Sequence, residues 1–271
     1  MSRVLGFAEG PAFLHLMKRY VIDYTNSHDQ AVTVDIMEPD YALRMGEHRV
    51  VGRDSEYFAA TRKQMDQFPG LMLTVHEIWT SGQRLMMRFS EHGASLRHGG
   101  AIAAWGGIGL YGWNGSRLTS NFVEQDYASR ALQLATGRPN AVEAPAPAPW
   151  DGETAAPDLL AEQTVRDWLA SGDPTTAPEI VCDDQWTGTD QTALLDQASI
   201  TINSLFSCGP RVAFHITQEG FVRPECDPAR VGQRVRLNMA GIVHLNSGTI
   251  TAGRIVRNRL ELQRTLSVTA K

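Results

Sequence analysis

Cysteine is scarce in this sequence, and long apolar runs are missing. The three cysteines, Cys182, Cys208 and Cys226, are odd in number and form neither a CxxC pair nor a Cys/His spacing typical of zinc sites. We therefore expect free thiols in a reducing compartment. No window offers the roughly 20 uninterrupted apolar residues of a membrane span, and no apolar run of signal-peptide length precedes Lys18 and Arg19. The sequence predicts a soluble, cytoplasmic protein without membrane contact.

Basic charge is also in deficit. Acidic side chains outnumber basic ones by 30 to 25, which gives a formal net charge of −5. Because phosphate binding needs a basic face, this balance argues against nucleic acid as the main partner. A local cationic site for a small anion remains compatible with it.

Sequence motifs for cofactors and metals are missing as well. The glycine pairs at 99–100 and 106–107 belong to neither a GxxxxGK nor a GxGxxG loop, and no HExxH is present. Four further histidines form no convincing metal set with carboxylates: His15, His28, His76 and His98. We therefore expect a site that works without a cofactor or a metal.

The sequence does contain enough apolar material for two domains. Hydrophobic residues make up 42% of the 271 residues, and a chain of this length divides comfortably into two domains of about 130 residues. Residues 137–149 form an Ala/Pro tract, GRPNAVEAPAPAP, with little to bury. We predict a first domain at 1–137, a linker at 138–150 and a second domain at 151–271.

Helices come before the strong strand signals in the first half. Apolar spacing and turn residues predict helices at 10–26 and 52–67, a short helix ending near Met37, strands at 71–79, 84–91, 101–113 and 117–125, and a closing helix at 126–135. An extended segment begins at Asp40. Helices followed by a curled antiparallel sheet indicate the α+β class rather than a doubly wound α/β fold.

The second half repeats this order. We predict a helix at 159–170, a long helix at 193–206 and a final hairpin within 240–256, and the segment 180–184 stands 144 positions after 36–40. The segment RVAFHITQEG at 211–220 matches RLMMRFSEHG at 84–93 without a gap. We interpret the two halves as an internal duplication, and chance similarity of two α+β halves is the alternative.

The strand RLMMRFSEHG carries the first candidates for chemistry. Strand side chains alternate between faces, so Arg88, Ser90 and His92 point the same way. His92 is the preferred acid/base, because an imidazole titrates near neutral pH, and Arg88 could hold an oxyanion. The alternatives are a histidine that faces water and a buried ion pair of Arg88 with Glu77 or Glu124.

Several short segments occur in an order that resembles a known family. They are Asp40-Tyr41 after the helix pair, Phe68-Pro69-Gly70 before a strand, Arg88 followed by His92-Gly93, and the closing run from Asp126 to Gln133-Leu134. This order is similar to that of the SnoaL-like polyketide cyclases of the nuclear-transport-factor-2-like superfamily, over about 13–137 and, through the repeat, roughly 159–266. The resemblance implies two tandem cone-shaped α+β domains, in which helices cap a curved antiparallel sheet around one deep apolar pocket.

The resemblance also implies an acid/base aspartate on the last long strand, which this sequence lacks. The corresponding position is Val123 in the first half and Ile255 in the second. The cyclase mechanism therefore does not simply transfer to either half. Asn121 and Glu124 are the nearest substitutes, although Glu124 belongs to the opposite strand face unless a bulge intervenes.

The implied cone places further side chains near the pocket. On the first strand, Asp40, Arg44 and His48 join His92 and Arg88 as candidates for catalysis, with a structural role as the alternative. The candidates for contact with a substrate are Tyr24, Ser90, Trp105, Tyr111, Asn121 and Glu124. Packing is the alternative for the aromatic residues among them.

The matching strand of the second half carries its own polar triplet, His215, Thr217 and Glu219. It indicates either a second pocket or, as we prefer, a dimerisation or stabilising module. We expect the protein to form a homodimer.

Together these residues predict a cofactor-independent enzyme that acts on a hydrophobic aromatic small molecule by general acid/base catalysis. The duplicated layout is similar to that of bacterial diarylpropane lyases that degrade lignin-derived dimers, which implies deformylation of a diol to a stilbene with release of formaldehyde. In such a reaction His92 would help the hydroxide to leave, and Arg88 or Asp40 would steer proton transfer. The alternatives are a cyclase, an isomerase or an epoxide hydrolase of the same fold, and a non-catalytic ligand-binding or assembly protein.

Overall fold

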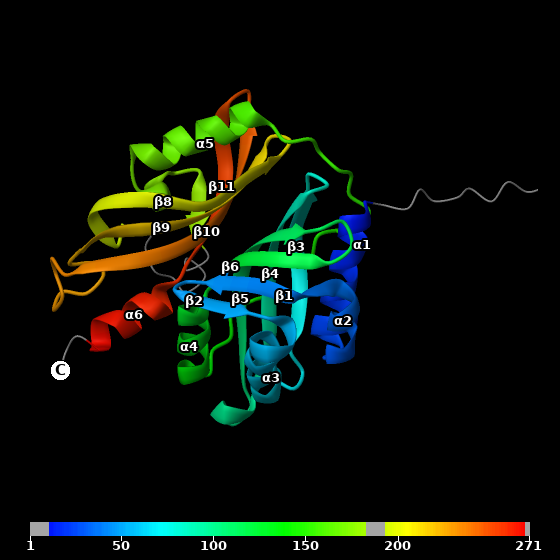
Figure 1. The fold of residues 1–271 in the computed structure, drawn as a ribbon. Helices are drawn as coiled ribbons and strands as arrows, with labels where there is room; N and C mark the ends of the chain where they lie inside the picture. Colours follow the sequence, from blue (N-terminus) through cyan, green and yellow to red (C-terminus); the bar gives the residue numbers. More distant parts are fainter. Residues whose placement is uncertain (1–10, 183–192, 269–271) are drawn as a thin grey trace, which may run out of the picture.

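Two curved sheets, each covered by helices, make up the chain (Figure 1). The computed structural model describes residues 11–182 and 193–268. The predicted α+β class is confirmed, because helices pack on one face of two mainly antiparallel sheets instead of connecting parallel strands. Within the described residues, no helix is both long and apolar enough to cross a membrane.

The first domain builds a six-stranded sheet. Its strands are β1 (Met37–Met45), β2 (His48–Val51), β3 (Met72–Thr80), β4 (Arg84–Ser95), β5 (Ala101–Trp113) and β6 (Leu118–Gln125), in the order β2-β1-β6-β5-β4-β3. β1 and β6 run parallel, and the other neighbours run antiparallel. The four strands predicted for this half after residue 70 are confirmed to within a few residues.

Helices cover the inner face of this sheet. They are α1 (Ala12–Lys18), η1 (Arg19–Asn26), η2 (Gln30–Val32), α2 (Thr33–Ile36), η3 (Arg53–Tyr57) and α3 (Phe58–Gln67); η4 (Leu96–His98) joins β4 to β5, and α4 (Tyr127–Thr136) follows β6. α1 and η1 follow each other without a break, and their buried residues recur every three or four positions: Phe13, Met17, Tyr20 and Tyr24. Asp126 caps α4 by accepting a hydrogen bond from the backbone N–H of Ser129 at 3.0 Å.

Alternation along β4 decides which side chains face these helices. Leu85, Met87 and Phe89 belong to the core on the inner face, whereas Met86 belongs to a separate cluster on the outer face. The inner face therefore carries the odd-numbered residues, Glu91 among them.

The second domain has one helix before its sheet and one after it. Its elements are α5 (Leu159–Ser171), η5 (Pro174–Thr176), β7 (Ile180–Cys182), β8 (Leu195–Cys208), β9 (Arg211–Val222), β10 (Arg234–Asn246), β11 (Thr249–Arg257) and α6 (Arg259–Val268). The sheet order β7-β11-β10-β9-β8 reproduces that of the first sheet without β2, down to the parallel pair β7 and β11. This is the arrangement that a duplication would give, and the duplication itself stays a prediction. Residues 183 and 184 of the segment that corresponds to 36–40 lie outside the described residues.

The long helix predicted at 193–206 is wrong. These residues belong mostly to β8, which pairs along its length with β9. The segment contains the β-branched run Ile200-Thr201-Ile202, which favours a strand, and its register shifts twice, between Asp196 and Ser199 and between Ile202 and Ser204. Bulges of this kind disturb the alternation of apolar residues, and a disturbed alternation resembles helical spacing.

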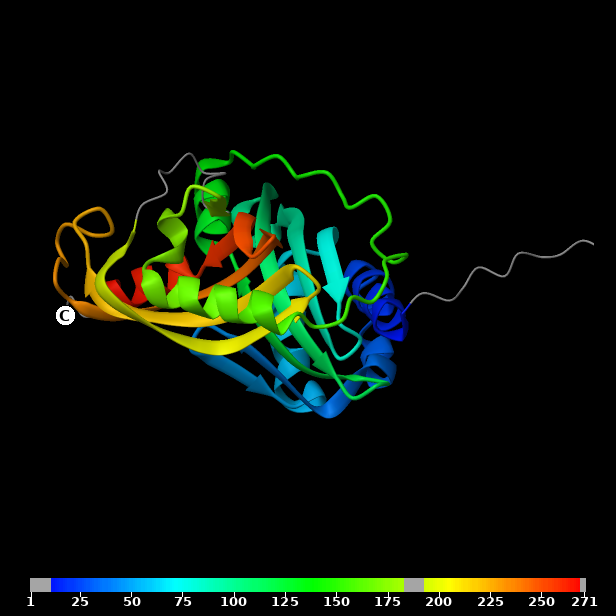
Figure 2. The ribbon, with the colours of Figure 1, turned by 90° about the horizontal axis from the view of Figure 1, so that it is seen from above.

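The outer faces of the two sheets pack against each other (Figure 2). The buried residues of this contact are Met86, Ile108, Leu110, Phe206, Cys208, Ala213, Ala240, Ile242 and Val256. α5 lies on the side of the second sheet that is turned away from the first domain (Figures 1 and 2). The second domain thus covers the outer face of the first sheet and leaves the helix-covered inner face free to hold a site.

The linker contributes to this arrangement. Residues 138–146 contain no helix or strand, yet the chain lies along β3, where the N–H of Ala146 donates to the carbonyl of Val75 at 2.8 Å. The carboxylate of Glu143 accepts two hydrogen bonds from Arg88, at 2.7 and 3.0 Å. The predicted linker is therefore extended but anchored.

Candidate functional site

A cavity of about 390 Å³ lies between the inner face of the first sheet and its helices. Most of its wall is apolar or aromatic. The apolar lining residues are Leu43, Met45, Val50, Ala60, Met65, Leu71, Leu73, Phe89 and Val123. A cavity of this size and character is suited to a small hydrophobic molecule.

Among the residues that the structure describes, Glu91 is the one carboxylate that lines the cavity. Its side chain comes from β4 and is 7% exposed. Burial raises the pKa of Glu91 from 4.5 to about 7, against the opposing effects of the Arg130 charge and the hydrogen bond from Gln64. At neutral pH this carboxyl group therefore exists in both its protonated and its ionised form.

Amide side chains hold this carboxyl group in place. The Nε2 of Gln64 donates to Oε2 of Glu91, and the Oε1 of Gln64 accepts from the hydroxyl of Tyr127 at 3.2 Å. Trp105 lies on the neighbouring strand β5, and its indole N–H donates to Oε1 of Gln125 on β6 at 2.7 Å. The guanidinium of Arg130 lies 3.9 Å from the centre of the Tyr127 ring.

Tyrosines form much of the remaining wall. All six tyrosines of the chain are in the first domain, and five of them line the cavity: Tyr20, Tyr24, Tyr57, Tyr111 and Tyr127. Their rings meet mostly edge to face or tilted, at 5.7 to 6.2 Å between centres. Burial raises the pKa of each of these hydroxyls, so they stay protonated at neutral pH and can donate hydrogen bonds.

Two buried polar atoms of this wall lack a partner. Within the described residues, neither the hydroxyl of Tyr24 nor the Oδ1 of Asn121 makes a hydrogen bond. The residues are only 1% and 2% exposed. Since buried polar atoms are normally paired, a ligand hydroxyl that both donates and accepts is the kind of group that would satisfy them.

Room for the aromatic wall comes from glycine on β5. A Cβ atom at Gly109 would approach the Tyr111 ring to 2.6 Å. Gly109 therefore leaves the space that the Tyr111 ring occupies in the cavity wall.

Four of the sequence-predicted residues line the cavity. Tyr24, Tyr111 and Asn121 are buried in its wall. His48 lies at the exposed rim on β2, next to Arg49. Their roles in binding or catalysis stay predictions.

Arg88, Ser90 and His92 share one face of β4, as predicted, but it is the outer face, and the expectation that it lines the pocket is wrong. Besides Glu143, Arg88 approaches the carboxylate of Glu77 at 3.8 Å. Ser90 is paired with the Nε2 of His76 at 2.9 Å, and the Nε2 of His92 with the hydroxyl of Thr74 at 3.1 Å. The apolar residues 85, 87 and 89 take the inner face because only there can they be buried against the helices.

Four further candidates also lie outside the cavity wall. Asp40 is exposed on β1, and Arg44 donates to the Oδ1 of Asn203 in the second domain at 3.3 Å. Glu124 is on the outer face of β6, as the alternation predicts, and contacts the second domain. Trp105 is fully buried behind the wall, where it packs on Phe68 with ring centres 5.3 Å apart.

Glu91 is the residue that sequence reasoning missed. The signal was present, because Glu91 is the only charged residue on the otherwise apolar face of its strand. A lone carboxyl group among Leu, Met and Phe predicts either a strand end in water or a buried acid with a raised pKa, and the structure shows the second.

The three residues of the polar triplet in the second half have different surroundings. His215 is buried in the contact between the domains, where it pairs with Glu124. Thr217 is buried and accepts a hydrogen bond from Asn203 of its own domain, and Glu219 pairs with Arg234 at 2.8 Å near the surface. At the position of the missing aspartate, Val123 is in the cavity wall and Ile255 is part of the second core. Across residues 11–182 and 193–268, no three His, Cys, Asp or Glu side chains converge to hold a metal ion.

No protein-family model and no curated protein matches this sequence. Several solved structures are similar to part of the chain. A protein from Jannaschia sp. CCS1 described as a SnoaL-like polyketide cyclase is 14% identical, with 45% of this chain and 90% of that chain covered and a TM-score of 0.42. An LEH-like epoxide hydrolase from M. tuberculosis is also 14% identical, with 46% of this chain and 85% of that chain covered and a TM-score of 0.39.

A third structure comes from Catenulispora acidiphila, a hypothetical protein with a ketosteroid isomerase-like fold in complex with trimethylamine. It is 14% identical, covers 44% of this chain and 92% of its own, and has a TM-score of 0.39. Each of these matches spans about half of this chain. At such low identity none of them assigns a reaction to it.

Proposed function

We propose that the cavity of the first domain is the active site of an enzyme that acts on a hydrophobic aromatic small molecule by general acid/base catalysis. The observation that carries this proposal is Glu91, a buried carboxyl group with a pKa of about 7 in an apolar cavity. A catalytic acid or base works best when its pKa lies near the operating pH. The reaction requires neither a metal nor an organic cofactor.

The residues around Glu91 support distinct parts of this role. Gln64 orients the carboxyl group, and the protonated hydroxyls of Tyr20, Tyr24 and Tyr111 are donors for an oxygen that gains negative charge during the reaction. The aromatic rings and aliphatic residues of the wall favour an aromatic ring system over a sugar or a charged metabolite.

Within this class we propose a lyase reaction, the deformylation of a phenolic diarylpropane diol. Protonated Glu91 gives its proton to the benzylic hydroxyl, the C–O bond breaks and water leaves. The phenol gives its proton to solvent water, and the substrate becomes a quinone methide; the same solvent returns this proton to the phenolate in the last step. The Glu91 carboxylate then takes the proton of the hydroxymethyl group. The C–C bond breaks, formaldehyde leaves, and the electron pair forms the stilbene double bond and restores the aromatic ring, whose oxygen regains its proton. Glu91 ends in its starting form.

The test is incubation of the purified protein with such a diol, with formaldehyde and stilbene measured together. Glu91→Gln should lower kcat by about 10²- to 10⁴-fold, the usual contribution of general acid/base catalysis. His92→Ala is the matched control, because this side chain lies on the outer face of the same strand, and it should keep the wild-type rate. Folded wild-type protein that releases no formaldehyde would exclude the lyase reaction, and a Glu91→Gln variant with the wild-type rate would exclude the role of Glu91.

A second candidate is a ligand-binding protein without turnover. It is favoured by the aliphatic side chains of Val123 and Ile255, where the resembled cyclases have their acid/base aspartate. Tight binding of an aromatic ligand that is recovered unchanged after long incubation would support this function over the enzyme. A cyclase, isomerase or epoxide hydrolase would instead convert other aromatic substrates and would still depend on Glu91.

A further inference from the structure

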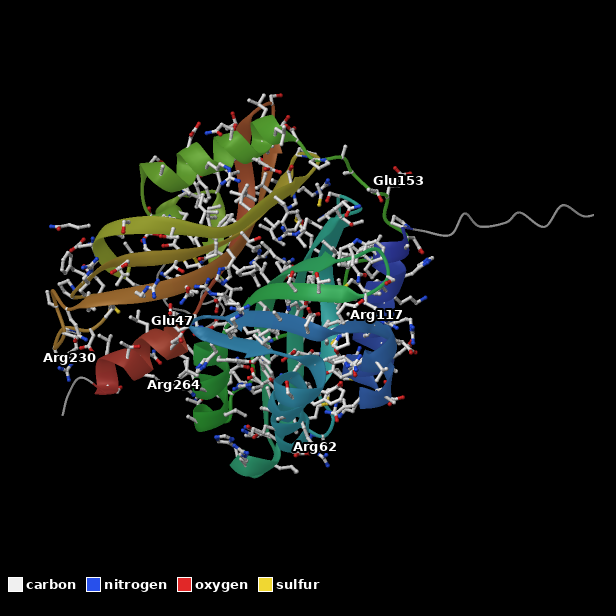
Figure 3. The ribbon with its side chains drawn as sticks, in the orientation of Figure 1. Glu47, Arg62, Arg117, Glu153, Arg230 and Arg264 are labelled. Atoms are coloured by element: carbon white, nitrogen blue, oxygen red, sulfur yellow. The ribbon has the colours of Figure 1, made fainter. Side chains whose placement is uncertain are left out.

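The turn between β1 and β2 lies between the cavity entrance and the second domain. The entrance is the exposed rim at His48 and Arg49. The cavity is lined by the residues on both sides of this turn: Leu43, Met45, His48, Arg49 and Val50. The central residues of the turn, 46 and 47, contact the second domain instead. Figure 3 shows Glu47 at the tip of this hairpin, where it meets β10 and α6.

Glu124 is the centre of this contact. Its carboxylate is fully buried and accepts three hydrogen bonds: from the backbone N–H of Gly46 at 2.7 Å, from Nε2 of His215 at 2.9 Å and from Nδ2 of Asn258 at 2.9 Å. The first donor belongs to the hairpin and the other two belong to the second domain. Losing any one of these donors would leave a buried carboxylate oxygen with fewer hydrogen bonds, which costs stability. The contact therefore holds the hairpin and the second domain in one arrangement.

Further hydrogen bonds from the second domain hold the rest of the turn. The backbone N–H of Glu47 donates to the carboxylate of Glu261, at 3.1 and 3.3 Å to its two oxygens. The carboxylate of Glu47 accepts from Asn238 at 3.2 Å and from Arg236 at 3.1 Å. Gly46 has a positive φ of 58°, and a Cβ atom there would overlap the Glu261 carboxylate. The turn therefore fits the second domain closely in both shape and charge.

We propose that the second domain fixes the entrance of the cavity, with Glu124 as the positioning residue that ties the β1–β2 hairpin to His215 and Asn258. In this arrangement the second domain takes part in the function of the first, although none of its described residues lines the cavity. The proposal concerns access to the cavity and holds whichever reaction takes place there.

The chain offers a matched control for this proposal. A second His–carboxylate contact joins the domains, between Nε2 of His244 and Oε1 of Glu77 at 2.8 Å. It lies on β10 and β3, away from the hairpin. Removing this contact also takes away a histidine–carboxylate pair between the domains, but it leaves every hydrogen bond of the β1–β2 turn in place.

The experiment compares His215→Leu and Glu124→Gln with His244→Leu in the full-length protein. Amide hydrogen exchange is measured for residues 43–50, and the pKa of Glu91 is measured by carbon NMR of its carboxyl group. We expect exchange at 43–50 to become about tenfold faster or more in the first two variants, the effect of losing one hydrogen bond to a charged group. The pKa of Glu91 should fall from about 7 toward its ordinary value, because a loosened entrance admits water.

His244→Leu should lower the melting temperature but change neither measurement. An equal response in His244→Leu would mean that general domain packing, not the Glu124 contact, holds the hairpin. Unchanged exchange and an unchanged Glu91 pKa in folded His215→Leu and Glu124→Gln would mean that strand pairing alone holds it. Either result overturns the proposal, and neither measurement requires turnover, so a failure of the proposed reaction is seen separately.

Discussion

At the scale of single residues, Glu91 links stability to pH. Its pKa is raised in the folded protein, so the native state binds a proton more tightly than the unfolded chain between pH 4.5 and about 7. The sign follows from linkage: stability from this group is complete below pH 4.5 and is lost as the pH rises through 7. At about 1.4 kcal/mol per pH unit, the loss amounts to about 3 kcal/mol at most.

We therefore expect Glu91→Gln to be more stable than the wild type at pH 8 and to show no such gain at pH 4. The measurement is urea unfolding of both proteins across this range, and the difference between their free energies of unfolding isolates Glu91 from other titrating groups. A difference that does not change with pH would contradict the raised pKa.

The unpaired atoms of Tyr24 and Asn121 give a second prediction at this scale, which rests on the proposed aromatic substrate. A phenolic probe, 4-hydroxystilbene, should bind more tightly than 4-methoxystilbene, because its hydroxyl can both donate and accept. Asn121→Leu and Tyr24→Phe should remove about 1–3 kcal/mol of this preference each. Titration of stilbene fluorescence gives both dissociation constants, and an equal loss for the two probes would show that the substitutions only damage the wall.

The sequence predicts which side chains of a strand share a face better than it predicts which face meets the cavity. Arg88, Ser90 and His92 do share a face of β4, because the period of a strand is fixed by its geometry. Which face meets the cavity depends on where the helices and the second domain pack. The polar face of β4 is buried against the linker and β3 with partners such as Glu143, and a sequence does not state these partners.

At the scale of elements, strong local signals are the ones that the structure confirms. β5 occupies the predicted 101–113, and the turn after it contains Asn114 and Gly115, a pair typical of hairpin turns. β8 was missed because its pairing with β9 contains two register shifts, and pairing between distant segments outweighs local spacing there. The cavity needs several elements to meet and so cannot be located from any one of them.

The β1–β2 hairpin carries the prediction that belongs to this scale. Gly46→Ala places a side chain at a positive φ and against Glu261, so it should destabilise the protein by about 2 kcal/mol or more. Gly99→Ala is the matched control, because Gly99 has a φ of 63° with no described atom within 4 Å of the added carbon. Chemical denaturation should show a smaller loss for Gly99→Ala, of about 1 kcal/mol from the backbone alone, and equal losses would argue against the close fit of the turn.

At the scale of the whole molecule, the two domains share a buried apolar contact and the polar contact around Glu124. Ile242 of β10 is 1% exposed in that apolar contact, whereas Ile255 of β11 is fully buried inside the second domain. Because each sheet needs the other to cover its outer face, we expect the described chain to unfold in one cooperative transition. The second domain is then part of one folding unit and not an independent attachment.

Ile242→Ala and Ile255→Ala should each lower the stability by about 2–5 kcal/mol, the usual effect of truncating a buried isoleucine, and both should keep the single transition. The measurement is thermal unfolding followed in parallel by far-ultraviolet circular dichroism and by tyrosine signals, which report the first domain alone because all six tyrosines lie there. The two melting curves should coincide and shift together, although Ile255 lies in the other domain. If the melting temperature from the circular dichroism signal falls in Ile255→Ala while that from the tyrosine signal does not, the domains unfold separately. The stability of the cavity would then not depend on the second domain.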